Sequence, residues 1–228
     1  MKQKLILIGN GMAGVRTLEE LLKLTPDRYE ITVFGDEPHP NYNRIMLSPV
    51  LAREKSFDEI VLNDWDWYHE HGITLHTGSP VSTIDRAKRE VVTADGKRTR
   101  YDRLVIATGS LPFILPVEGH DLEGVVGFRT VADVERMRDA AGAHRHAVVI
   151  GGGLLGLEAA NGLLQHGMEV TVLHLPDVLM ERQLDDSAAA VLQQTLEQRG
   201  LDILTGADTE KLLGRERVEA VRLKDGRE

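Results

Sequence analysis

The sequence of 228 residues contains no cysteine. This absence excludes a redox-active disulfide, an iron–sulfur cluster bound by thiolates and a cysteine nucleophile. Any redox chemistry of this chain therefore belongs to bound organic cofactors. The histidines do not suggest a metal site either, since His69 and His71 point to different faces of a helix, and His144 and His146 flank a loop.

Long apolar runs and an excess of basic residues are also missing. No stretch reaches the ~20 apolar residues that a membrane-spanning helix needs. The N-terminus runs from a short apolar strand straight into a glycine motif, where a secretory signal would need its cleavage region. We therefore expect a cytoplasmic protein that binds no membrane. The net charge of −9, with acidic and basic residues interspersed, leaves no basic stripe for nucleic acid.

Two glycine motifs of the dinucleotide-binding type are present instead. GNGMAG at residues 9–14 follows the apolar run 5–8, and GGGLLG at residues 151–156 follows the apolar run 147–150. The first glycine permits a tight turn, the second lets the backbone approach a pyrophosphate, and the third lets the helix pack closely on the strand. The phosphates then lie at a helix N-terminus, where free N–H groups favour negative charge. Two copies, each between a strand pattern and a helix pattern, predict two dinucleotide sites.

The candidate contacts within the motifs are Gly9, Asn10, Gly11, Met12, Ala13 and Gly14 in the first, and Gly151, Gly153, Leu154, Leu155 and Gly156 in the second. A dinucleotide fold usually has an acidic residue at the end of its second strand, to accept hydrogen bonds from a ribose hydroxyl. The first unit offers Asp36 or Glu37 at this place. The second unit offers His174, which has one donor and one acceptor when neutral and could accompany a phosphate when protonated. Arg182 is a further candidate for a 2′-phosphate, with a solvated arginine as the favoured alternative, so the choice between NADH and NADPH stays open.

A longer internal repeat extends the two motifs. Residues 71–78 match residues 199–206 in apolar pattern, each reading as a helix end and a short strand. The first copy continues through short strands to an apolar run at 104–106. The second ends at residue 228 soon after its own turn, so we expect an incomplete second unit, with a disordered tail after Leu213 as the alternative. We therefore predict an α/β fold class with two Rossmann-like dinucleotide-binding domains, and we expect the second to be inserted in the first and truncated at its C-terminus.

Three helices and one long loop complete the pattern. Apolar spacing predicts helices at residues 14–24, 130–141 and 186–199, with Thr130 as an N-cap. Residues 35–57, which contain proline and asparagine, are predicted to form a long loop.

Further motifs resemble a known family. The sequence has NYNR at residues 41–44, ATGS at 107–110, FRT at 128–130 and LMERQLD at 179–185. Together with the glycine motifs, they resemble the N-terminal part of the large subunit of NAD(P)H-dependent nitrite reductase. That family belongs to the FAD-dependent pyridine nucleotide oxidoreductases, which include rubredoxin and ferredoxin reductases.

The resemblance implies a cofactor for each domain. Residues 1–128 would form the first part of an FAD-binding domain, and residues 129–228 an incomplete NAD(P)H-binding domain. Besides the first glycine motif, the implied FAD contacts are Asp36, Arg44, Ser48, Val81, Ala107, Thr108, Gly109 and Arg129. Glu158 would lie near the nicotinamide. Related ferredoxin reductases pair this glutamate with a lysine where the present chain has Pro49, so Glu158 needs another partner or stays solvated.

The implied activity is the electron-input step of an assimilatory-type nitrite reductase. Siroheme and iron–sulfur ligands would lie downstream, so the partners are NAD(P)H, downstream redox domains of the same polypeptide and, as an open alternative, a small subunit. We assign no residue of this chain a catalytic role. Two other interpretations remain: an NAD(P)H-dependent rubredoxin or ferredoxin reductase, and an NAD(P)H-sensing module without turnover.

Overall fold

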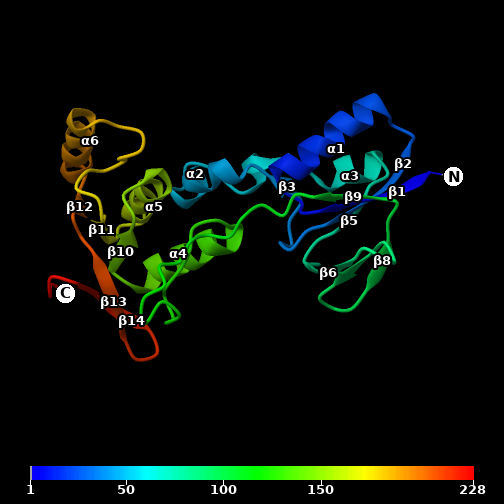
Figure 1. Ribbon diagram of the computed structural model, residues 1–228. Helices are drawn as coiled ribbons and strands as arrows, with labels where there is room; N and C mark the ends of the chain where they lie inside the picture. Colours follow the sequence, from blue (N-terminus) through cyan, green and yellow to red (C-terminus); the bar gives the residue numbers. More distant parts are fainter. Residues whose placement is uncertain (1) are drawn as a thin grey trace. The chain divides into compact units, whose positions relative to one another are not determined.

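The computed structural model describes residues 2–228, which form two compact units (Figure 1). The first comprises the chain up to Arg44 together with Phe57–Ser110, and the second comprises Ile45–Ser56 and Leu111–Glu228. The division into cofactor domains at residues 128 and 129 stays a prediction. Within residues 2–228, no helix is long and apolar enough to cross a membrane.

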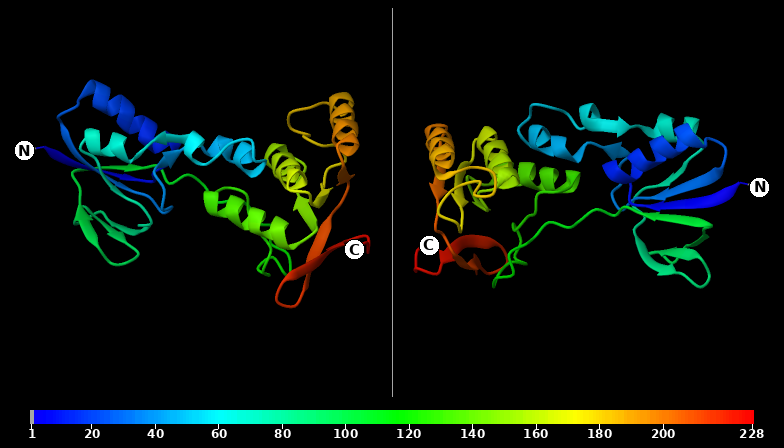
Figure 2. Two further views of the ribbon diagram at one scale, coloured as in Figure 1. Left: turned by 180° about the vertical axis from the view of Figure 1, so that it is seen from behind. Right: turned by 45° about the horizontal axis from the view of Figure 1, so that its top comes forward.

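A parallel sheet with the order β5-β2-β1-β9 is the centre of the first unit. Its strands are β1 (Gln3–Ile8), β2 (Tyr29–Phe34), β5 (Thr74–His76) and β9 (Arg103–Ile106). Helices α1 (Met12–Leu24) and α3 (Trp65–Glu70) lie on one face, and the antiparallel strands β6 (Val81–Asp85), β7 (Glu90–Thr93) and β8 (Arg98–Arg100) lie on the other (Figure 2). Because both faces are covered, β1 buries successive residues from Leu5 to Ile8 instead of alternating ones.

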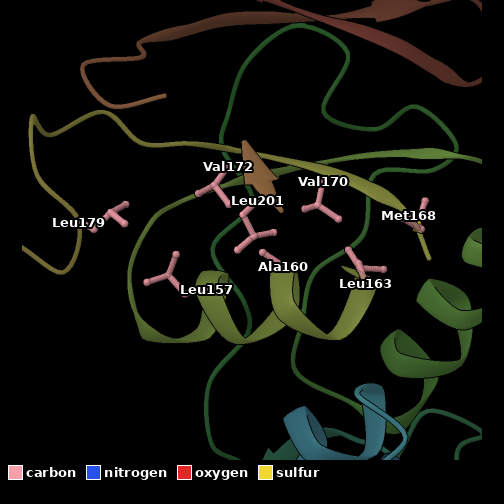
Figure 3. Close-up of a cluster of buried hydrophobic side chains, with 8 residues drawn as sticks. All are labelled: Leu157, Ala160, Leu163, Met168, Val170, Val172, Leu179 and Leu201. Carbon is pink, nitrogen blue, oxygen red and sulfur yellow. The ribbon is translucent and has the colours of Figure 1, made fainter. Parts of the chain in front are cut away.

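The second unit repeats this plan with a three-stranded parallel sheet in the order β10-β11-β12. Its strands are β10 (His146–Ile150), β11 (Glu169–Leu173) and β12 (Leu201–Leu204), and its main helices are α4 (Val131–Ala143), α5 (Leu154–Gln165) and α6 (Asp186–Gln198). An antiparallel pair, β13 (Thr209–Gly214) and β14 (Val218–Leu223), follows. Leu157, Ala160 and Leu163 of α5 pack against Val170 and Val172 of β11 in the core (Figure 3).

The two sheets differ at one edge. In the first unit, β9 pairs with β1, and Ile6 and Ile8 are buried. In the second, Val148 and Ile150 of β10 are 47% and 42% exposed, and no other described strand pairs with β10 besides β11. The internal repeat therefore extends to three parallel strands in each unit and to the one helix that follows each glycine loop.

Most of the expected elements are present. The predicted helices correspond to α1, α4 and α6. Thr130 caps α4, since its side chain accepts a hydrogen bond from the Asp133 N–H while the Asp133 carboxylate accepts one from the Thr130 N–H. The alternative of a disordered tail after Leu213 is wrong, because β14 pairs with β13.

The prediction of a loop over residues 35–57 is also wrong. This stretch contains β3 (Asn41–Tyr42), which pairs with β4 (Val61–Asn63), then the 3-10 turn η1 (Arg44–Met46) and helix α2 (Leu47–Leu51); a second 3-10 turn, η2 (Asp58–Ile60), follows. Three of the five residues of α2 are buried: Leu47, Val50 and Leu51. Tertiary packing rather than local propensity therefore forms this helix, which is too short to be stable alone.

Leu179 tests the core of the second unit. It is fully buried against the α5–β11 cluster, so Leu179→Ala should lower the free energy of unfolding by about 3 kcal/mol through lost burial and a residual cavity. Leu175→Ala in the same connection, at a side chain 62% exposed, should change it by about 0.5 kcal/mol or less. Urea unfolding measures both; equal effects would contradict this packing.

Candidate functional site

The two glycine motifs form loops of the same geometry. Parallel pairing continues one residue beyond each first strand, since the Gly9 N–H donates to the Phe34 carbonyl and the Gly151 N–H to the Leu173 carbonyl, both at 2.8 Å. Gly9 and Gly151 then take φ angles of +104° and +122°, which side chains strongly disfavour. Each loop turns sharply here and leads into a helix.

The third glycine of each motif packs on the first. A Cβ atom on Gly14 would lie 2.8 Å from the Gly9 carbonyl oxygen, and one on Gly156 would lie 1.9 Å from the Gly151 carbonyl oxygen. Any larger residue would push the helix off the loop. Close packing therefore explains these two glycines without a ligand.

The second glycine of each motif has no such explanation. Gly11 (φ −86°, ψ 174°) and Gly153 (φ −84°, ψ 179°) have extended backbones that any residue adopts. A Cβ atom on either would meet no protein atom within 4 Å. Neither strain nor packing requires glycine here, whereas close approach of a bound pyrophosphate does.

The helices that follow are open to an anion. Neither α1 nor α5 has a side chain that caps its N-terminus, and neither has an acidic residue in its first turn. Their first N–H groups and helix dipoles are therefore available to phosphate oxygens. Leu154 and Leu155, two predicted contacts, are more than half exposed at the start of α5. The residues present fit a dinucleotide in both loops.

A polar network holds Asn10 in the first loop. Its Oδ1 accepts a hydrogen bond from the Tyr68 hydroxyl at 2.7 Å, its carbonyl accepts one from the Asn41 amide, and its own amide donates to the His39 carbonyl. Burial raises the pKa of Tyr68 above its usual range, so the hydroxyl keeps the proton that it donates. No sequence motif points to Tyr68, which lies 58 positions away.

The two acidic candidates after β2 have different surroundings. Glu37 accepts hydrogen bonds from the Tyr42 hydroxyl at 2.7 Å and from Arg44 at 2.5 Å, and its side chain is largely buried. Asp36 is exposed, and its carboxylate accepts the Glu37 N–H at 3.0 Å. Arg44 is thus already paired through Glu37, and the contacts of all three residues with FAD stay predictions.

The Ala107-Thr108-Gly109 turn lies against the first loop. The Ala107 N–H donates to the Ile8 carbonyl at 2.8 Å, and a Cβ atom on Gly9 would lie 2.2 Å from the Ala107 carbonyl oxygen. Val81, at the start of β6, packs on the cluster under the first sheet. The structure therefore gathers these predicted contacts within the first unit. Arg129 belongs to the second unit, where its N–H donates to Asp133.

Glu158 has a partner in the second unit. The Ser48 hydroxyl donates to its Oε2 at 2.5 Å, although the two residues are 110 positions apart. Ser48 directly precedes the proline that replaces the lysine of ferredoxin reductases. Ser48 is therefore the partner that Glu158 needs in place of the lysine. The hydrogen bond also uses the donor of Ser48, which is a predicted FAD contact.

His174 is buried beside the second loop. Its Nδ1 accepts the Gly152 N–H at 2.9 Å, so this nitrogen carries no hydrogen. Its Nε2 therefore carries the hydrogen and donates to Glu181 Oε2 at 3.2 Å. Both ring nitrogens are thus engaged, one by the loop backbone and one by Glu181, so neither is left for a phosphate. Among the described residues, no group of three or more histidine, aspartate and glutamate side chains could hold a metal ion.

Two parallel sheets, each with a glycine loop that opens onto a free helix N-terminus, define a protein that binds two dinucleotides. Residues 3–228 match the model of the pyridine nucleotide-disulphide oxidoreductase family. The chain belongs to this family, and its cofactors are FAD and NAD(P)H.

Relatives and solved structures agree with this assignment. The chain is 51% identical over 225 residues to nitrite reductase [NAD(P)H] of Bacillus subtilis (strain 168), covering 99% of this chain and 28% of that protein. It is 52% identical over 226 residues to the assimilatory nitrate reductase electron transfer subunit of the same organism, covering 99% and 29%. The ferredoxin reductase for the CYP199A2 system from Rhodopseudomonas palustris matches with a TM-score of 0.90 and 27% identity, covering 99% of this chain and 56% of that one. The chain thus spans less than a third of the length of the first two relatives.

Two alanine substitutions separate ligand approach from packing in the second loop. Gly153→Ala should weaken NADH binding by at least about tenfold, yet change the free energy of unfolding by about 1 kcal/mol or less, since its Cβ meets open space. Gly156→Ala should lower stability by about 2 kcal/mol or more, because its Cβ meets the Gly151 carbonyl. Calorimetric titration and urea unfolding measure the two effects. Unchanged NADH affinity in a folded Gly153→Ala variant would refute the assignment of this loop.

Proposed function

We propose that this chain is the electron-input part of an assimilatory-type nitrite reductase, in which a hydride passes from NAD(P)H to FAD for onward reduction of nitrite to ammonia. The observation that carries the proposal is 51% identity to nitrite reductase [NAD(P)H] across 99% of the chain. The paired glycine loops supply a separate, physical support, because each fits a dinucleotide.

The residues of this chain bind and orient the two cofactors. Gly9, Gly11 and Gly14 would hold the FAD pyrophosphate, and Gly151, Gly153 and Gly156 that of NAD(P)H. When bound, NAD(P)H supplies a hydride and FAD accepts it. The contribution of the protein is to hold the reacting groups in a productive orientation. The Ser48 hydroxyl fixes the carboxylate of Glu158, the residue expected near the nicotinamide.

The remaining chemistry lies outside these residues. The chain has no cysteine to hold an iron–sulfur cluster. We therefore propose that siroheme and iron–sulfur centres in downstream domains of the same polypeptide take the electrons. We also propose that the protein acts in the cytoplasm. The share of the relatives that the chain covers, 28% and 29%, leaves room for such domains.

A second candidate is electron transfer to an assimilatory nitrate reductase. It rests on the 52% identity to an electron transfer subunit of such an enzyme, which is as high as the identity to nitrite reductase. The electron-input role is the same in both. The ferredoxin reductase interpretation has a weaker basis, since the ferredoxin--NAD(+) reductase subunit of the benzene 1,2-dioxygenase system of Pseudomonas putida is 34% identical over 230 residues and the ferredoxin reductase structure is 27% identical. None of these relatives is named as a sensor without turnover.

Spectroscopy of the whole polypeptide, as its gene encodes it, tests the function. The purified protein should show flavin and siroheme bands, and NADH or NADPH should bleach the flavin band under anaerobic conditions. Nitrite should then reoxidise the protein and accelerate consumption of the reduced nucleotide, while nitrate should not. A yellow protein without siroheme, indifferent to nitrite, would exclude the leading proposal; reoxidation only by a nitrate reductase would favour the second candidate.

A further inference from the structure

The end of β11 is the place where a dinucleotide fold distinguishes NADH from NADPH. An acidic side chain there accepts hydrogen bonds from the 2′-hydroxyl of the adenosine ribose, whereas an arginine accommodates a 2′-phosphate. This chain has neither directly after β11. It has His174, which is 7% exposed.

His174 brings a carboxylate to this position. Because Nδ1 accepts the Gly152 N–H, the ring hydrogen is on Nε2 and points to Glu181. The imidazole thus bridges the backbone of the glycine loop and the Glu181 side chain. The carboxylate that is missing at the end of the strand is supplied from seven residues further along.

The connection between β11 and α6 is built to hold this carboxylate. Leu179 is fully buried in the core, and the Met180 N–H donates to the Gly152 carbonyl at 3.1 Å. Met180 also has a φ angle of +55°, an uncommon conformation for a residue with a side chain. Gly152 is therefore bonded through its N–H to His174 and through its carbonyl to Met180. The first bond fixes the ring that contacts Glu181, and the second fixes the residue directly before it.

Charge at this position favours a ribose without a phosphate. The Oε2 atom of Glu181 is hydrogen-bonded to His174, and its Oε1 atom lies 3.8 Å from the Arg182 Nε. A carboxylate can accept hydrogen bonds from a ribose hydroxyl, but it repels a 2′-phosphate. Arg182 is 86% exposed, whereas the Glu181 side chain is 35% exposed.

We propose that Glu181, positioned by His174, sets the preference of this protein for NADH over NADPH. The inference rests on the proposed function, because it requires the second loop to bind a pyridine nucleotide. Glu181 would accept from the adenosine ribose. His174 is a positioning residue, which acts through the orientation of Glu181.

Binding of the oxidised nucleotides to the whole polypeptide tests the proposal without turnover. In calorimetric titrations, NAD⁺ should bind about tenfold or more tightly than NADP⁺. Glu181→Gln removes the charge but keeps the shape, so it should lower this ratio by about tenfold, through weaker NAD⁺ binding and stronger NADP⁺ binding. His174→Ala should lower the ratio in the same direction.

Asp186→Asn is the matched control. It removes one negative charge from an exposed residue at the start of α6 and should leave the ratio unchanged. Thermal melting shows which variants fold; if His174→Ala does not, Glu181→Gln carries the test, since its side chain is 35% exposed.

The outcomes separate the two proposals. Tighter NADP⁺ binding by the unaltered protein, an unchanged ratio in Glu181→Gln, or an equal change in Asp186→Asn would overturn this inference and leave the proposed function in place. If neither NAD⁺ nor NADP⁺ binds, the proposed function of the second loop is wrong, and this inference fails with it.

Discussion

The contact between the third and the first glycine of each motif is the constraint on which both units depend. It brings the first turn of a helix onto the carbonyl oxygen at the end of a strand, at a distance that leaves no room for a Cβ atom. This contact fixes where the helix N-terminus lies relative to the sheet. The free N–H groups, the open space at Gly11 and Gly153, and the side chains around each loop all follow from that position.

The residue between the first two glycines is held differently in the two loops. In the first, Asn10 is bonded through its side chain to Tyr68 and to the segment that contains β3. In the second, Gly152 is bonded only through its backbone, to His174 and Met180. One backbone geometry is therefore supported by two unrelated sets of side chains. A loop held on both sides is preorganised, so binding costs little conformational entropy.

The features that could be predicted from the sequence are those set by residues near one another in the chain. The glycine loops, their helices and the Thr130 cap depend on residues close together in the chain, and the structure has each of them. Helix α2 escapes such prediction because it is five residues long, contains Pro49 and is formed by burial. The bonds from Tyr68 to Asn10 and from Ser48 to Glu158 join residues 58 and 110 positions apart. No local pattern could reveal them, since only the tertiary fold brings these side chains together.

The segment Ile45–Ser56 belongs to the second compact unit although the first unit flanks it in sequence. Leu51 of this segment lies against Gly162, where a Cβ atom would come within 2.6 Å of it, and its carbonyl is hydrogen-bonded to the ring of His166, 115 positions later. During synthesis on the ribosome, α2 therefore emerges long before α5 exists to cover it. The nascent chain has to carry an unburied Leu51 until α5 has been synthesised, and a shortened chain that begins at residue 111 would lack one side of the second unit's packing.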